Sequence, residues 1–104
     1  MKETLRISLV QMDVIWEDIN ANLNHVEELL QNLPESDIVV LPEMFTTAFT
    51  VSAPDLAEGN DGTTMQTVSK WAKEYNSLFI GSFIAYPLLA LLTSELGLYE
   101  QAFR

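Results

Sequence analysis

The order of apolar and polar residues predicts a strand and then a helix at the start of the chain. The stretch Leu5–Met12 begins with apolar residues at every second position, which is the period expected of a strand. Over residues 20–33 the leucines and valine recur three or four positions apart, as in an amphipathic helix. Asp18 or Asn20 is the predicted N-cap, and Pro34 is expected to end the helix.

Two later segments, Asp37–Leu41 and Leu78–Ala85, are continuous apolar runs. Such runs are typical of strands that are covered on both faces. Between them, residues 46–62 contain the Thr, Ser, Pro, Asn and Gly of a long loop. Thr63–Tyr75 then shows helical spacing and is expected to be capped by one of the two threonines at its start. The order strand, helix, strand, loop, helix, strand predicts an α/β fold with a parallel or mixed sheet.

The leucine-rich tail, residues 86–104, has two interpretations. Its apolar residues fall near helical spacing, and Pro87 is tolerated in the first turn of a helix, so we predict a C-terminal helix. Gly97 weakens this prediction. The alternative is a strand through Leu88–Leu92 that is followed by a turn at "TSELG".

Length and charge exclude several classes of protein. The chain has 104 residues, which is at most one domain, and it is 48% hydrophobic and 19% charged, as expected of a globular protein. Its net charge is −10, and no Lys or Arg occurs between Arg6 and Lys70. Because phosphates are bound by clustered cations, no nucleic-acid or membrane partner is expected. The membrane-like stretch Leu78–Leu92 is too short to span a bilayer and is assigned to the buried core.

We expect neither a metal nor a cofactor. His25 is the only histidine, and the acidic residues Asp55, Glu58 and Asp61 lack the spacing of a calcium loop. There is no cysteine, and hence no disulfide and no thiolate chemistry within these residues. Together with an N-terminus that does not resemble a signal peptide, this favours a cytoplasmic location.

The segment "LPEMFTTAF", residues 41–49, contains the strongest candidate for chemistry. Glu43 directly follows a proline at the end of a predicted strand, and strand ends are where ligand sites collect in α/β sheets. A carboxylate among Met44, Phe45 and Phe49 would be partly desolvated, which suits a general base. From residue types alone, an ordinary loop glutamate is the alternative.

Three segments, in this order, resemble the start of the nitrilase superfamily of carbon–nitrogen hydrolases, and in particular its omega-amidase branch. They are "LRISLVQMDVIWEDINANLNHVEELL", "DIVVLPEMFTTAFT" and "GSFIA". The likeness covers residues 4–85, about the first third of such a domain. We therefore divide the chain into a partial carbon–nitrogen hydrolase domain, residues 1–85, and a divergent tail, residues 86–104.

This resemblance implies the N-terminal part of an αββα sandwich, with a mixed sheet and helices packed on one face, and a Glu-Lys-Cys mechanism. In the family, the glutamate is the base toward a cysteine thiol, which attacks an amide or nitrile carbon, and a lysine stabilises the oxyanion. Glu43 matches the glutamate. Phe45 and Phe49 match the segment that borders the substrate pocket, with core packing as the alternative. The implied substrate is a small amide.

The sequence departs from the family pattern at two points. Ala48 stands where omega-amidase-like sequences usually have glycine, so we expect the backbone turn with positive φ to be either strained or different here. The cysteine and the family lysine are missing, and Lys70 and Lys73 lie on the polar side of a predicted helix. The resemblance implies a hydrolase acting on non-peptide C–N bonds, and we predict that this chain alone is inactive.

The leading interpretation is therefore a fragment of a carbon–nitrogen hydrolase. The alternative is a small non-catalytic α/β module that binds or assembles with a partner. A third possibility is that the chain has no function of its own. Because half of a sandwich leaves apolar sheet surface uncovered, we predict self-association or marginal stability.

Overall fold

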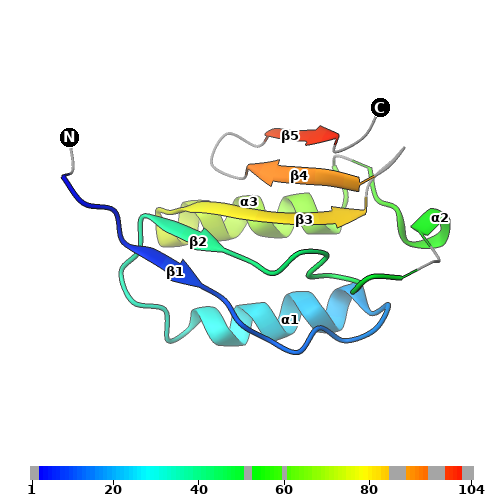
Figure 1. Ribbon diagram of the computed structural model, residues 1–104, viewed down its shortest axis with the longest axis horizontal. Helices are drawn as coiled ribbons and strands as arrows, with labels where there is room; N and C mark the ends of the chain where they lie inside the picture. The colour runs from blue at the N-terminus through cyan, green and yellow to red at the C-terminus, as the bar shows by residue number, and fades with distance from the viewer. Residues whose placement is uncertain (1–2, 51–52, 60, 85–88, 94–97, 102–104) are drawn as a thin grey trace.

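A single five-stranded sheet organises the chain, and its strands lie side by side in the order in which they occur in the sequence (Figure 1). The computed structural model describes residues 3–50, 53–59, 61–84, 89–93 and 98–101. The elements are β1 (Ile7–Leu9), α1 (Ile19–Leu30), β2 (Ile38–Val40), α2 (Ala53–Leu56), α3 (Thr63–Tyr75), β3 (Leu78–Ile84), β4 (Leu89–Thr93) and β5 (Leu98–Gln101). Strands β1, β2 and β3 are parallel, and β4 and β5 are antiparallel to their neighbours. The predicted α/β class with a mixed sheet is confirmed.

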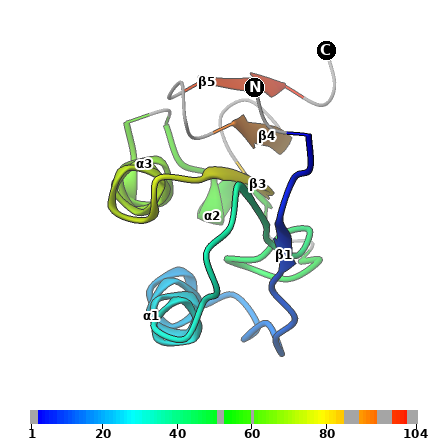
Figure 2. The ribbon, with the colours of Figure 1, turned by 90° about the vertical axis from the view of Figure 1, so that its left-hand side faces the viewer.

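The long helices α1 and α3 lie on the same side of the parallel strands (Figure 2). Their apolar sides pack on the middle of the sheet, where Val39 of β2 and Phe79 of β3 are fully buried. Val26 of α1 and Trp71 of α3 are also fully buried in this cluster. The core is therefore a single layer between helices and sheet, as the helical spacing and the covered strands predicted.

Helix α1 is capped by one of the two predicted residues. The Asp18 carboxylate accepts a hydrogen bond from the Ala21 N–H at 3.0 Å, which satisfies a donor that has no partner within the helix. The helix ends at Leu30, earlier than predicted, and the chain continues in a tighter turn in which the Leu33 N–H donates to the Leu30 carbonyl, three residues back.

Helix α3 has the predicted bounds but a different cap. Gly62 is its N-cap residue, and no side chain at that position makes a capping bond. The side chain of Glu58 provides the capping bonds instead. Its carboxylate accepts hydrogen bonds from the Thr64 N–H at 2.9 Å and from the Thr64 hydroxyl at 2.5 Å. A glutamate from the acidic loop thus stabilises a helix start, where negative charge is favourable.

The predicted C-terminal helix is wrong, and the strand alternative is correct for the described part of the tail. β4 pairs with β3 in register Ile84↔Leu89 to Ile80↔Thr93, and β5 pairs with β4. The physical reason is that β3 would otherwise present an unpaired edge, and an antiparallel strand satisfies its backbone groups. Pro87 and the "SELG" part of the predicted turn lie outside the described residues.

The apolar stretch Leu78–Leu92 supplies β3 and most of β4. Phe79 and Phe83 of β3 are fully buried, which agrees with the assignment of this stretch to the core. Across the part of the chain that the structure describes, no helix has the length and apolar character needed to cross a membrane.

Candidate active site

Glu43 emerges at the carboxyl end of the parallel strands. The Leu41 N–H donates to the Ile80 carbonyl at 2.8 Å, so the pairing of β2 with β3 continues one residue beyond Val40. Glu43 follows two residues later, and its side chain is exposed. The position is the one at which ligand sites form in α/β sheets. The partial desolvation expected from the sequence is not found among the described residues.

The two predicted substrate-binding phenylalanines lie in different environments. Phe45 is fully buried in the core cluster with Leu41, which is the core-packing alternative. Phe49 is 70% exposed. The structure therefore agrees with core packing for Phe45 but not for Phe49.

The Gly-Ser pair of β3 contacts the segment that carries Glu43. A Cβ atom on Gly81 would lie 3.2 Å from Leu41 Cβ and 3.5 Å from Phe45 Cδ1, so a larger residue would press on both side chains. The neighbouring Ser82 hydroxyl accepts a hydrogen bond from the Met44 N–H at 3.0 Å. Two of the motifs noted in the sequence, far apart along the chain, thus form one local structure.

A buried amide fixes the other end of the segment. Asn22 of α1 is fully buried, and its Nδ2 donates to the Thr46 carbonyl at 2.7 Å and to the Ile15 carbonyl at 2.8 Å. Its Oδ1 accepts from the Ile15 N–H at 2.7 Å. The Glu17 N–H donates to the Thr47 carbonyl at 3.0 Å. The loop after β1, the start of α1 and the segment after β2 are thereby tied together.

Backbone strain is concentrated in the same region. Met44 has φ 51° and Ala48 has φ 64°, and Glu17 on the adjoining loop has φ 54°. Each is in the left-handed region, which costs about 1–2 kcal/mol for a residue with a Cβ. Such strain persists where the surrounding contacts determine the backbone, and it is common at functional sites. Of the two possibilities for Ala48, a strained turn with positive φ or a different backbone, the structure shows the strained turn.

Replacing Ala48 by glycine is expected to raise the free energy of unfolding by about 1 kcal/mol, because glycine removes the left-handed strain and loses only part of this gain to its greater unfolded-state entropy. The measurement is urea unfolding followed by circular dichroism. Ala72→Gly, in the right-handed backbone of α3, is the matched control and should lower stability by about 1 kcal/mol. A loss of stability in both variants would contradict the expectation.

Lys70 and Lys73 of α3 are surface residues. Both are exposed, and the Lys70 ammonium lies 4.0 Å from the Glu27 carboxylate of α1, which places it in the helix layer. In the same layer, burial raises the pKa of the Tyr75 hydroxyl, and the nearby carboxylates of Glu74 and Glu27 raise it further. Among the described residues, no group of three His, Asp or Glu side chains is arranged to hold a metal ion.

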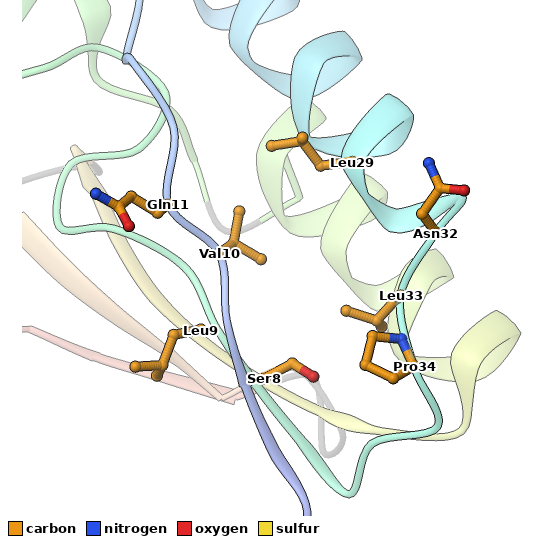
Figure 3. A pocket seen from close by; sticks show the side chains of 8 residues that line it. All are labelled: Ser8, Leu9, Val10, Gln11, Leu29, Asn32, Leu33 and Pro34. Atoms are coloured by element: carbon orange, nitrogen blue, oxygen red, sulfur yellow. The ribbon is translucent and has the colours of Figure 1, made fainter.

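A cavity of about 400 Å³ lies between the end of β1 and the last turn of α1 (Figure 3). Its lining comes from residues 8–11 and from Leu29 and residues 32–34. Glu43, Phe45 and Phe49 do not contribute to it. The cavity is therefore separate from the candidate active site.

Comparison with known proteins identifies the family. The family model for carbon-nitrogen hydrolases matches residues 6–99, so the chain belongs to this family, and the match extends into the leucine-rich tail. Omega-amidase YafV of Yersinia enterocolitica is 44% identical over 54 residues, which are 52% of this chain and 21% of that protein. Omega-amidase YafV of Escherichia coli is 36% identical over 78 residues, covering 75% of this chain and 30% of that protein.

The fold agrees with a solved member of the same superfamily. XC1258 from Xanthomonas campestris, a CN-hydrolase superfamily protein whose crystal structure has an arsenic adduct in the active site, matches with a TM-score of 0.81 and 34% identity. The match covers 92% of this chain and 38% of that one. The chain thus has the fold of the N-terminal part of a nitrilase-like sandwich, and it spans about a third of the length of these relatives.

Sequence reasoning missed Asn22 and its role. The available signal was its position four residues before Val26 and eight before Leu30, on the apolar stripe of α1. A polar residue on such a stripe is buried together with its hydrogen-bond partners. This pattern would have marked Asn22 as a residue that holds neighbouring loops in place.

Proposed function

We propose that Glu43 is the general base of an amide-hydrolysing centre, and that this chain supplies the glutamate-bearing part of an omega-amidase-type hydrolase. The observation that carries the proposal is the contact between two motifs. The segment with Glu43 rests on Gly81 and bonds to Ser82, at the carboxyl end of the parallel strands. A carboxylate on a backbone fixed in this way has the defined position that proton transfer requires.

The chemistry needs a nucleophile that these residues do not contain. In the proposed reaction, Glu43 accepts the proton of a thiol whose sulfur attacks the carbon of a small omega-amide. The proton passes to the departing nitrogen, so ammonia leaves and a thioester forms, which water then hydrolyses. The chain has no cysteine, and a carboxylate alone activates water poorly. We therefore expect no hydrolysis by the 104-residue chain alone. The comparisons do not favour the alternative of a non-catalytic binding module.

The proposal is tested in the chain and in a chimera. The pure chain, incubated with the omega-amide α-ketoglutaramate, should release no ammonia above the rate without protein. In the chimera, the matching N-terminal part of Escherichia coli omega-amidase YafV is replaced by the corresponding residues of this chain, and the rest of YafV is expected to supply the cysteine and lysine. This chimera should release ammonia.

Ammonia release by the pure chain would contradict the missing-nucleophile argument. A chimera that folds, as judged by circular dichroism, but does not hydrolyse the amide would overturn the assignment of this segment to an amidase centre.

A further inference from the structure

Glu17 makes two hydrogen bonds to the segment that follows Glu43. It lies in the turn between β1 and α1, directly before the N-cap residue of α1. Its backbone N–H donates to the Thr47 carbonyl at 3.0 Å, and its carboxylate accepts a hydrogen bond from the Thr50 hydroxyl. One residue of the loop before α1 therefore holds two points of the segment after β2.

The two residues that Glu17 binds lie on either side of Phe49 in the chain. The Phe49 side chain is 70% exposed, although phenylalanine is among the residues most often buried. The backbone beside it is closely hydrogen-bonded, because the Ala48 N–H donates to the Met44 carbonyl at 2.8 Å and the Thr50 N–H donates to the Ala48 carbonyl at 3.0 Å. An exposed aromatic side chain on a fixed backbone is preorganised for contact with a ligand.

We propose that Glu17 is a positioning residue for the substrate. Its carboxylate holds the backbone that carries Phe49, so that the aromatic ring stays where it contacts the carbon chain of the omega-amide. The inference rests on the proposed function, because it assigns Phe49 to the substrate side of the centre to which Glu43 belongs. It adds to that centre a residue from the loop before α1.

The chemistry of the carboxylate suits this role. An ionised carboxylate only accepts hydrogen bonds, so the Thr50 hydroxyl is the donor, and a hydrogen bond to a charged group is stronger than a neutral one. Glu17 has φ 54°, a strained conformation that persists where surrounding contacts determine the backbone. Glu17→Gln keeps an oxygen that accepts the hydrogen bond, whereas Glu17→Ala removes it.

The contact that fixes the backbone beside Glu43 is a different one. The Ser82 hydroxyl accepts a hydrogen bond from the Met44 N–H, next to Glu43 in the chain. Loss of the Glu17 carboxylate should therefore release Phe49 and leave the base in place. Substrate binding should be weakened, and the chemical step should not.

The hold on the segment is tested in the 104-residue chain by limited proteolysis with chymotrypsin, which cleaves after large apolar residues. Cleavage after Phe49, identified from the fragment masses, requires local opening of the segment. It should be about tenfold faster in Glu17→Ala, as expected when a hydrogen bond to a charged group is lost, and Glu17→Gln should recover most of the protection. Thr50→Val removes the donor of the same bond and should act like Glu17→Ala. Glu28→Ala, at an exposed position of α1, is the matched control and should not change the rate.

The role in substrate binding is tested in the YafV chimera with α-ketoglutaramate. Glu17→Ala should raise KM by about tenfold and change kcat by less than about twofold, the pattern expected when ground-state and transition-state binding are lost equally. Phe49→Ala should have the same effect. The two substitutions together should raise KM no further than Phe49→Ala alone, because Glu17 acts through Phe49. Glu17→Gln should recover most of the loss.

The contrary results are distinct from one another. Unchanged cleavage after Phe49 in Glu17→Ala, with native circular dichroism, would show that the carboxylate does not hold the segment. A lower kcat at unchanged KM, or independent effects of the two alanine substitutions, would overturn the action through Phe49. A folded but inactive chimera would overturn the proposed function and with it the substrate role of Phe49, whereas the proteolysis would still decide whether Glu17 holds the segment.

Discussion

Replacing Asn22 by leucine is expected to lower the free energy of unfolding by about 3 kcal/mol, because leucine removes one buried and two part-buried hydrogen bonds to backbone groups. Leaving a buried polar group unsatisfied costs about 1–3 kcal/mol. The backbone groups are the N–H and carbonyl of Ile15 and the carbonyl of Thr46. The Thr46 hydroxyl is buried and has no hydrogen-bond partner among the described residues. The substitution would therefore add a second unsatisfied oxygen in the same residue.

The measurement is chemical unfolding of the two proteins at equal concentration. Asn24→Leu is the matched control, since Asn24 is exposed on the same helix and its replacement should change stability by less than about 0.5 kcal/mol. If the Asn22 variant were no less stable than the Asn24 variant, the buried amide would not hold the loops as described.

Replacing Glu43 by glutamine in the YafV chimera is expected to lower kcat/KM by about a thousandfold, within the range attributed to a general base. Glutamine has the same shape but does not accept the thiol proton. Because Glu43 is exposed and the segment is fixed through backbone groups and the Leu41 and Phe45 side chains, the fold should be unchanged. The rate of ammonia release gives the result directly.

Glu28→Gln is the control for this substitution. Glu28 is exposed on α1, and the change removes the same charge without touching the candidate site. Its kcat/KM should equal that of the unmodified chimera. Similar rates for the two variants would mean that Glu43 is an ordinary loop glutamate, the alternative given in the sequence analysis.

Prediction from the sequence was most accurate for elements whose hydrophobic spacing lies within the element itself. Thr63–Tyr75 has the predicted bounds, because its helical spacing extends over its whole length. The tail was predicted to be a helix because the spacing of its leucines suits one. Its structure instead depends on pairing with the open edge of β3, and such a long-range interaction is not visible in the local propensity of the residues. Glu58 as the cap of α3 also depends on a contact that crosses a loop.

For the candidate site, the sequence indicated the position of Glu43 and, as one of two possibilities, the strained positive φ of Ala48. It did not indicate that Glu43 is exposed here, since the residue types around it suggested an apolar environment. Phe45 belongs to the same segment, but its side chain is buried in the core whereas that of Glu43 is exposed. The directions of these two side chains depend on the strained backbone at Met44, which lies between them. Such local geometry is not encoded in residue type.

The strand order of the sheet has a consequence for biosynthesis. Each strand from β2 to β5 pairs with the one made just before it, so no strand has to wait for a later segment to be inserted beside it. Because the N-terminus leaves the ribosome first, each new strand from β2 onward emerges after the strand with which it pairs. The growing sheet therefore adds every new strand at the same edge, the one opposite β1.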